Sequence, residues 1–425
     1  MKSRNATSRL NVVWHDGRLI GELLHSGPIY FRYAPEWLAT GHNLSPLKLV
    51  FDGRVVNCHG AADGVPGLIS DALPDTWGRR VAESIFARAG LGRPTPFKLL
   101  AWVGTRGLGA VGFEPALGLP ESGPTLLERI RASALAREAR AVQEGDLDRL
   151  LPNLSHGMTG GGAQPKILVV AKADNTLRLP TSATPLVKGE KSCLLKLDVA
   201  GQSRHRVELA YLEMAARAGI TTPSARLLTD ENSRDHLLIE RFDVGASGGK
   251  RHFHSLAGLL HRPPGDLDYA DLFQATTRLG CPRTDLLSAA RRMLFNLRAG
   301  NQDDHGKNHA FLYDEEFRTW HLAPAYDLTH SPGLDRGLRI AGEVVPRWSR
   351  LREWLADAGL RPAEIKQASE AVDEAIAAWP KIARKHSVPA AQITEITATH
   401  KRIAAQFCFL SGSVAPREKS KKASP

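Results

Sequence analysis

The segments FNLRAGNQDDHGKNHAFLYD, residues 295–314, and HLAPAYDLTHS, residues 321–331, decide the fold prediction for this chain. Asp303 and Asn308 lie five positions apart in them, and Asp327 follows Asn308 after 19 more positions. Mg²⁺ is a hard cation that prefers oxygen ligands, so an asparagine and an aspartate in this arrangement suit it. The spacing therefore predicts a magnesium site beside the carboxylate of Asp303.

Protein kinases place a catalytic aspartate and a metal-binding asparagine at the same D-x-x-x-x-N spacing, with a second metal-binding aspartate on a later strand. By this pattern Asp303 orients the attacking hydroxyl, while Asn308 and Asp327 hold the metal. Apolar runs at 310–313 and 320–322 predict two short strands that fix the spacing. Taken singly, each aspartate also fits an ordinary loop, cap or turn residue. Phosphotransfer is favoured because the other parts of such a site occur upstream.

Lys196 lies in CLLKLDV, a run that predicts a buried strand. A lysine there costs free energy to bury unless it meets an anion. In kinases a strand lysine reaches the nucleotide phosphates and pairs with a glutamate on the next helix. Glu208 opens the next amphipathic pattern of this chain, which ends at Gly219. The alternative is an edge-strand lysine with its ammonium in solvent.

The glycine-rich run TGGGAQPK, residues 159–166, is a candidate phosphate-binding loop before the apolar run ILVVA. Glycines let backbone N–H groups approach anionic oxygens closely, and Lys166 adds positive charge. The run has neither the G-K-[ST] ending of a Walker A motif nor the G-x-G-x-x-G pattern, so a flexible linker is the alternative. Further on, LIERFD at 238–243 predicts a connection between two lobes that offers backbone groups to an adenine, although a simple strand end fits it equally well.

The rest of the chain predicts a β-rich part followed by a helical part. A hairpin is expected at 11–24 with an Asp-Gly turn, and further strands at 29–33 and 47–51. Two helices are expected at 67–90 and at 125–142, the second opened by a proline. Four apolar residues recur at helical spacing in the first of these helices: Ile69, Leu73, Trp77 and Val81.

From residue 256 onward the pattern is almost all helical, including 363–379 and 390–410. The fold class predicted from this order is α+β, a bilobal protein-kinase-like fold with a β-rich N-terminal lobe and a mostly helical C-terminal lobe. The expected divisions are a small α+β subdomain at 1–120, the remainder of the N-lobe at 121–245, the C-lobe at 246–412 and a basic tail at 413–425.

Composition adds limits to these predictions. Apolar residues make up 42% and charged residues 24% of the chain, an ordinary globular balance. The four cysteines are widely spaced, which argues against a disulfide scaffold or a zinc site and suits a reducing cytoplasm. Short apolar runs and the absence of a signal-peptide pattern predict a cytoplasmic chain without a membrane partner. The formal net charge of +11 permits a nucleic-acid partner but identifies none.

His252 and His254 would share one face of a strand, but no acidic or sulfur ligand completes a metal set at a sensible spacing. They are therefore expected at a lobe interface or at the surface.

Together these motifs resemble the HipA family of toxin kinases, the serine/threonine kinases of bacterial toxin–antitoxin pairs. The matching pieces are, in the family's order, LPDTWGRR, GGAQPK, LLKLD, the helix glutamate, LIERFD, GNQDDHGKN and PAYDLTHS. The resemblance covers about residues 10–410 and implies an ATP- and Mg²⁺-dependent protein kinase. It makes Asp303 the catalytic aspartate and gives the metal to Asn308 and Asp327, with Glu208 in support. The residues that it places on ATP are Gly161, Gly162, Ala163, Gln164, Lys166, Lys196, Glu240, Arg241, Phe242, His305, Lys307 and Tyr326.

The resemblance also implies regulation and partners. Family members phosphorylate a serine of their own glycine-rich loop, and that position falls at Thr159 here, with Ser155 as the nearby competitor. A phosphate there would be repelled from a site built for phosphates, which is a route to self-inactivation. The implied partners are a helix-turn-helix antitoxin (HipB-like), operator DNA through that complex, and a protein substrate such as an aminoacyl-tRNA synthetase.

Two other functions remain open from the sequence. One is a kinase for a lipid or a small molecule, which the lobe motifs do not exclude. The other is a nucleotide-binding co-repressor that acts with an antitoxin on DNA. Retention of Asp303, Asn308, Asp327 and Lys196 speaks against the co-repressor, because a degraded kinase usually loses at least one of these residues.

Overall fold

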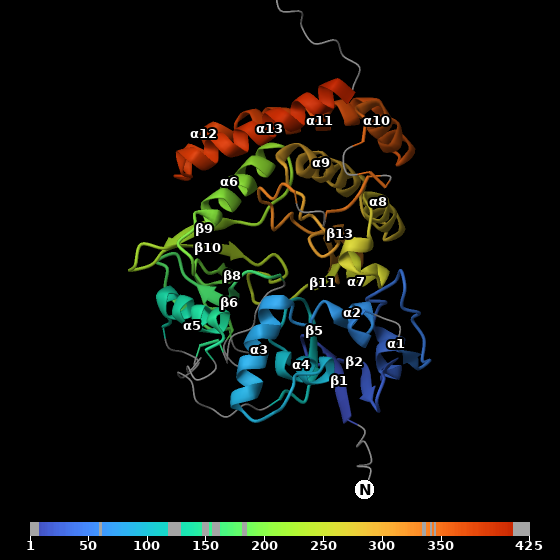
Figure 1. Ribbon diagram of the computed structural model, residues 1–425. Coiled ribbons are helices and arrows are strands. Elements are labelled where there is room, and N and C mark those ends of the chain that lie inside the picture. The colour runs from blue at the N-terminus through green and yellow to red at the C-terminus, as the bar shows by residue number, and fades with distance from the viewer. Residues whose placement is uncertain are drawn as a thin grey trace, which may run out of the picture.

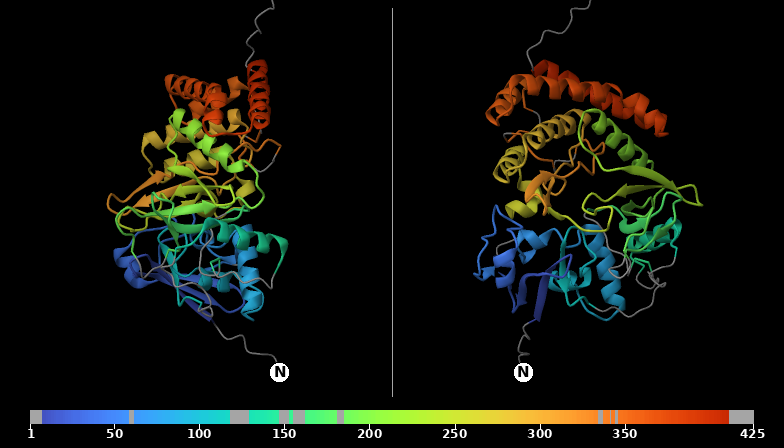
Figure 2. Two further views of the ribbon diagram at one scale, coloured as in Figure 1. Left: turned by 90° about the vertical axis from the view of Figure 1, so that its left-hand side faces the viewer. Right: turned by 180° about the vertical axis from the view of Figure 1, so that it is seen from behind.

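The structure is a computed structural model that describes residues 8–58, 62–117, 129–146, 153–154, 162–180, 185–333, 337–340, 342–343 and 346–410. Figure 1 shows an N-terminal subdomain in blue at one end, two further β-sheets in the middle, and a layer of C-terminal helices in red at the other end. Figure 2 shows the same layering from the side and from behind. No helix in the described ranges is long and apolar enough to cross a membrane.

The N-terminal subdomain is built on a five-stranded antiparallel sheet in the order β4-β3-β2-β1-β5. Its strands are β1 (Ser8–Trp14), β2 (Leu19–His25), β3 (Ile29–Tyr33), β4 (Val56–Asn57) and β5 (Val111–Glu114). The accompanying helices are α1 (Pro35–Thr40), α2 (Gly67–Ser70), α3 (Thr76–Arg88) and α4 (Pro96–Val103). The hairpin predicted at 11–24 and the strand predicted at 29–33 are confirmed.

Two predictions in this subdomain are wrong for local reasons. No strand forms at 47–51, because the Leu49 amide bonds to the Ser45 carbonyl and the Asn43 side chain donates to the Leu49 carbonyl, which closes a turn. The helix predicted at 67–90 is interrupted between α2 and α3, where Pro74 disfavours helical backbone before it. The apolar residues assigned to its packing face are nevertheless buried: Ile69, Leu73, Trp77 and Val81.

The second sheet has the order β7-β6-β8-β10-β9 and forms the β-rich part of the predicted N-lobe. Its strands are β6 (Lys166–Ala171), β7 (Leu177–Arg178), β8 (Lys191–Lys196), β9 (Ala225–Thr229) and β10 (Asp235–Glu240), and its helices are α5 (Ala132–Glu144) and α6 (Arg204–Arg217). The helix predicted at 125–142 begins later than expected, at Ala132. Ile130 is not helical because its amide bonds to the Leu177 carbonyl at 2.9 Å, while residues 118–128 lie outside the described ranges.

The third sheet is small, has the order β11-β12-β13, and is followed and surrounded by helices. Its strands are β11 (His252–Ser255), β12 (Ala310–Asp314) and β13 (Thr319–Leu322), so the two strands predicted around this loop are confirmed. The helices are α7 (Leu256–Leu260), α8 (Tyr269–Arg278), α9 (Arg283–Ala299), α10 (Trp348–Asp357), α11 (Pro362–Ala377), α12 (Trp379–Lys385) and α13 (Ala390–Leu410). The described residues thus form the α+β architecture that the sequence predicts.

Two large hydrophobic cores and one small cluster hold the buried apolar side chains of the described residues, and α6 belongs to the core formed with the C-terminal helices. Val207, Ala210 and Met214 of α6 are buried in the same cluster as the residues of α8, α9 and α11. The Tyr211 hydroxyl also donates to the Ala299 carbonyl at the end of α9, at 2.8 Å. Helix α6 is therefore anchored to the C-lobe. The anchor point on α9, Ala299, comes just before the loop that begins at Asn301.

Candidate active site

Two buried lysines face each other across the second sheet. Lys166 of β6 and Lys196 of β8 are direct partners in the antiparallel register, and each is only 3% exposed. Like charges directly opposite on neighbouring strands destabilise a sheet, and burial adds to that cost. Burial and then the nearby Lys196 lower the pKa of Lys166, against the opposing effect of Asp327. Such a pair is expected where anions are bound, because negative charge offsets both costs.

Carboxylates from both lobes meet Lys196. Its ammonium donates to Glu208 of α6 and to Asp327, which follows β13. Burial opposes ionisation of Asp327, but Lys196 and Lys166 together hold the pKa of this carboxyl well below its usual range. Asp327 also has left-handed backbone, with φ of 53°, a conformation that aspartate tolerates better than most residues. The predicted lysine–glutamate pair therefore forms, and the predicted metal-binding aspartate joins it.

The loop between α9 and β12 brings Asp303 and Asn308 together. The Asn308 amide nitrogen donates to the Asp303 main-chain carbonyl at 2.7 Å, which leaves the side-chain oxygen of Asn308 for another partner. Asp303 Oδ1 is buried and has no hydrogen-bond partner within the described part of the chain. A buried carboxylate oxygen without a donor carries a desolvation cost that a substrate hydroxyl would relieve.

The second aspartate of the same loop, Asp304, has a different environment. Its carboxylate accepts hydrogen bonds from the Tyr269 hydroxyl and, at 3.1 Å, from the Asn296 side chain. Burial raises the pKa of Asp304 to about 6 despite these bonds. Asp304 therefore fastens the loop to α8 and α9, whereas one carboxylate oxygen of Asp303 has no partner among the described residues.

The glycine-rich segment is described only from Gly162 onward, so the predicted roles of Gly161, Thr159 and Ser155 fall outside the described residues. Gly162 has φ of +104°, and a Cβ at this position would lie 2.6 Å from Lys166 Nζ. A glycine is thus required for the close approach of the loop to the lysine. Ala163 is exposed and Gln164 half-buried at the entrance to β6.

An aspartate of the N-terminal subdomain joins the glycine-rich segment to the loop between α9 and β12, residues 300–309, which is the candidate catalytic loop. Asp75 Oδ2 accepts from the Gly162 amide at 2.5 Å, and Asp75 Oδ1 pairs with Lys307 Nζ at 2.6 Å. The sequence did not predict Asp75 as a site residue. One signal in the sequence could have pointed to it. The proline of the LPD segment, residues 73–75, breaks a run of helically spaced apolar residues just before Asp75.

The segment predicted to connect the lobes ends β10 and carries an aromatic cluster. The ring of Phe242 lies 5.6 Å from that of Tyr326 and 6.2 Å from that of Phe253, measured between centroids. The Arg241 guanidinium donates to the Asp243 carboxylate at 2.6 and 2.9 Å, and the Glu240 carboxylate accepts from the exposed Lys191. The main-chain amides of these two residues are also engaged, since Glu240 donates to the Ser224 carbonyl at 2.8 Å and Arg241 to the Ser192 carbonyl at 2.9 Å.

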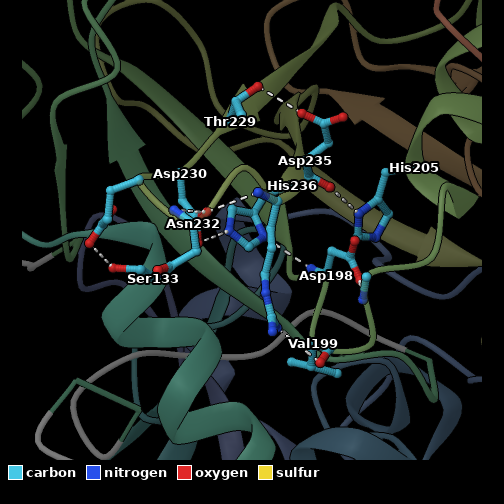
Figure 3. A network of polar contacts seen from close by, with 12 residues as sticks. Ser133, Asp198, Val199, His205, Thr229, Asp230, Asn232, Asp235 and His236 are labelled. Carbon is cyan, nitrogen blue, oxygen red and sulfur yellow. Dashed lines mark hydrogen bonds and ion pairs between the residues drawn. The ribbon is translucent and has the colours of Figure 1, made fainter.

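A polar network fixes the end of β8 just after Lys196 (Figure 3). The Asp198 amide donates to His236 Nδ1 at 3.0 Å, and His236 Nε2 lies 3.3 Å from Asp230 Oδ2. Burial lowers the pKa of His236, which fits a neutral ring that accepts at Nδ1. The Asp198 carboxylate accepts the Gly201 amide at 2.7 Å in the turn before α6. The network was not predicted. It links the end of β8 to β10 and to the turn before α6, and so supports the positions of Lys196 and Glu208.

His252 and His254 lie at the predicted lobe interface. His252 Nε2 bonds to the Leu44 carbonyl at 2.7 Å, and His254 bonds to Asp71 at 2.7 Å and to Ser45 at 3.0 Å. Among the described residues no group of three or more histidines, cysteines, aspartates and glutamates could hold a metal. The predicted metal ligands Asn308 and Asp327 carry side-chain oxygens of the kind that Mg²⁺ prefers, and this ion usually keeps several waters and takes other ligands from phosphates.

The lobes, the strand lysine paired with a helix glutamate, and the D-x-x-x-x-N loop define the class: the chain has a protein-kinase-like fold. It belongs to the HipA family, since it matches the HipA-like C-terminal domain over residues 158–379 and the HipA N-terminal domain over residues 11–114. The predicted resemblance is thereby confirmed.

Two known proteins show how far the similarity extends. The chain is 28% identical over 353 residues to Y4mE of Sinorhizobium fredii, a protein named only as a candidate kinase, with 76% of this chain and 77% of that protein covered. Its fold is similar to that of HipA from Shewanella oneidensis, solved in complex with HipB and its operator DNA. That match has a TM-score of 0.67 at 17% identity and covers 95% of this chain and 97% of the other.

Proposed function

We propose that this chain is an ATP- and Mg²⁺-dependent serine/threonine protein kinase. The observation that carries the proposal is the pair of buried lysines, Lys166 and Lys196, whose charges act on Asp327. With it goes a carboxylate oxygen of Asp303 that has no partner among the described residues. Phosphoryl transfer needs little beyond positioning and charge stabilisation, and this arrangement supplies cations for phosphates next to a carboxylate for a hydroxyl.

Each group has a definite task in the proposed reaction. Lys166, Lys196 and the backbone of the glycine-rich loop, 161–164, bind phosphate oxygens. Asn308 and Asp327 hold magnesium, which when bound neutralises charge on the phosphates. Asp303 accepts the proton of the attacking hydroxyl and orients its oxygen for in-line transfer.

The residues around the adenine ring and the remaining site residues have supporting tasks. The backbone at 240–242 meets the adenine edge, with Phe242 and Tyr326 as apolar cover. His305 and Lys307 lie in the catalytic loop near the phosphates, and Glu208 keeps Lys196 in place. These assignments follow from the contacts above and from the family pattern.

Regulation and partners belong to the proposal as well. The HipA neighbour was solved with HipB and operator DNA, which supports a HipB-like helix-turn-helix antitoxin and, through it, operator DNA as partners of this chain. We place self-inactivating phosphorylation at Thr159, with Ser155 as the competing position. The proposed substrate is a cellular protein, with an aminoacyl-tRNA synthetase as the first candidate.

The test is phosphate transfer from labelled ATP with Mg²⁺, comparing the wild-type chain with Asp303→Asn and mapping every modified residue. Label that appears on the wild type and vanishes in the variant supports the kinase, and its position decides between Thr159 and Ser155. Protein that binds ATP, carries no phosphate beforehand and still transfers none contradicts the protein-kinase proposal. The co-repressor, or a kinase for a small molecule or lipid, would then take its place.

A further inference from the structure

Asp75 stands at the start of α3, where an aspartate ordinarily caps its own helix. It makes no such cap bond. One carboxylate oxygen accepts from the Gly162 amide at 2.5 Å and the other pairs with Lys307 Nζ at 2.6 Å. A side chain of the N-terminal subdomain therefore bridges the two loops between which phosphate transfer is proposed.

The segment that carries Asp75 is itself hydrogen-bonded to the C-lobe. Four residues earlier, the largely buried Asp71 accepts from the Ser255 amide at 2.7 Å and from the Ser255 hydroxyl at 2.6 Å, and it pairs with His254. Ser255 joins β11 to α7. Asp71 thus fixes one end of the linker between α2 and α3, so the position of Asp75 is set by the C-lobe.

Trp77, on the other side of Asp75, fixes the segment to the second sheet. Its indole donates to the Lys166 carbonyl at 2.9 Å, and its amide meets the Gly162 carbonyl at 3.3 Å. The backbone of Gly162 is therefore held from both sides by residues of α3. Within the described residues, one short segment reaches the glycine-rich loop, a strand lysine and the catalytic loop.

Lys307 directly precedes Asn308, so a shift of Lys307 would also move the proposed metal ligand. The Lys307 carbonyl accepts from the Tyr326 hydroxyl at 2.5 Å, and Tyr326 precedes Asp327. The Asp75–Lys307 pair is 20% and 27% exposed at its two side chains, so solvent screens it only in part.

We propose that Asp75 is a positioning residue that sets the distance between the glycine-rich loop and the catalytic loop, which makes the N-terminal subdomain a working part of the active site. This inference rests on the proposed kinase function. It predicts that Asp75 acts on the transfer step more than on ATP affinity, because misplacing reacting groups by about 1 Å can cost about 100-fold in rate.

The activity test uses Asp75→Asn, which keeps an acceptor for Gly162 but removes the charge that holds Lys307. The matched control is Asp63→Asn, since Asp63 is an exposed carboxylate of the same subdomain that pairs only with Arg79 in the described structure, at 2.8 Å. We expect kcat to fall about 10-fold or more in Asp75→Asn while KM for ATP changes less than about threefold. Asp63→Asn should leave both constants unchanged.

A double-mutant cycle separates positioning from a general loss of structure. In a Lys307→Gln background, Asp75→Asn should have no further effect on kcat, because the partner that it positions is already gone. Equal effects in both backgrounds would overturn the proposal, and so would a rate loss that follows the loss of thermal stability. Tighter ATP binding with faster transfer would also overturn it, since Asp75 would then be an intramolecular competitor of the phosphates.

Hydrogen exchange gives an arm that does not depend on kinase activity. The Gly162 amide should be protected in the full-length wild type and in Asp63→Asn, and should exchange faster in Asp75→Ala, which lacks the acceptor. This arm still decides the role of Asp75 if the wild type transfers no phosphate. Unchanged protection in Asp75→Ala would show that the aspartate does not hold the glycine-rich loop.

Discussion

The ammonium of Lys196 contacts the carboxylate of Asp327, although the two residues lie 131 positions apart in the chain. The contact joins β8 of the second sheet to the segment after β13, and so closes the site from both lobes. The ammonium meets only Oδ1 of Asp327 among the described contacts, so the other carboxylate oxygen is the one that a magnesium ion in the proposed site would use.

The first prediction concerns the stability of this buried charge cluster. The Lys196 side chain is 4% exposed and that of Glu208 is 6% exposed. Lys196→Met removes the shared cation and leaves Glu208 and Asp327 facing each other. Removing one partner of a buried pair costs about 3–5 kcal/mol, so we expect a loss of that order in the free energy of unfolding, measured with denaturant.

The double variant Lys196→Met/Glu208→Gln provides the control, because it removes the stranded charge of Glu208. It should regain part of the lost stability but none of the phosphate transfer. Recovery of transfer in the double variant would contradict a role for Lys196 on the phosphates. Wild-type stability of the single variant would contradict the buried pair.

The second prediction concerns the metal. Asp327→Asn replaces a carboxylate by a weaker neutral ligand, so transfer should need about 10-fold more Mg²⁺ for half-maximal rate, with a lower rate at saturation. Asp314→Asn is a fair control, since Asp314 ends β12 of the small sheet that precedes Asp327 and accepts only the Phe317 amide among the described contacts. An unchanged Mg²⁺ requirement in Asp327→Asn would show that this residue does not hold the metal.

The candidate site could be proposed from the sequence because it is recognised by short spacings. The interval between Asp303 and Asn308, and a lysine inside an apolar strand pattern, are visible without a structure. The role of Asp75 is not visible, because it depends on contacts with Gly162 and with Lys307, 232 positions away. Spacing within one segment says nothing about which of many lysines will meet a given carboxylate.

The fold errors have a similar origin. Ile69, Leu73, Trp77 and Val81 are all buried, yet helical spacing did not reveal that the chain between α2 and α3 leaves the helix. The break at Pro74 lets Asp71 and Asp75 reach the C-lobe. These tertiary contacts, rather than the helical spacing of the apolar residues, determine the backbone here. The predicted strand at 47–51 failed because the side chain of Asn43, outside the apolar run, closes a turn there.

The third prediction uses a glycine. Gly162→Ala would place a methyl group 2.6 Å from Lys166 Nζ at a backbone φ of +104°, so the lysine must shift. Gly145→Ala lies at the end of α5 with φ of +73°. No described atom lies within 4 Å of the added methyl group, so backbone strain is its expected cost. Both variants should lose about 1 kcal/mol of stability, but only Gly162→Ala should lose about 10-fold or more in transfer rate. Equal activity of the two variants would show that the approach of Gly162 to Lys166 is not needed.

The fourth prediction is a pH dependence of stability at the interface between the N-terminal subdomain and the C-lobe. His252 Nε2 bonds to the Leu44 carbonyl, while Nδ1 is buried without a partner in the described structure. Burial first, and then the neighbouring His254 and His42, lower the pKa of His252 to about 3, against small opposing effects of Leu44 and Asp71. A second proton on this ring would therefore be strongly resisted in the folded chain.

The unfolded chain takes up that proton near its ordinary pKa of about 6.5, so it binds more protons than the folded chain between pH 6.5 and about 3. Stability from the neutral ring is present above pH 6.5 and is lost as the pH falls. His252→Gln keeps a donor for Leu44 but cannot titrate. Between pH 7 and pH 5 the wild type should lose about 2 kcal/mol more unfolding free energy than the variant, measured with denaturant at each pH. Equal losses in the two proteins would mean that the folded chain does not lower the pKa of His252, and that the interface does not require a neutral ring.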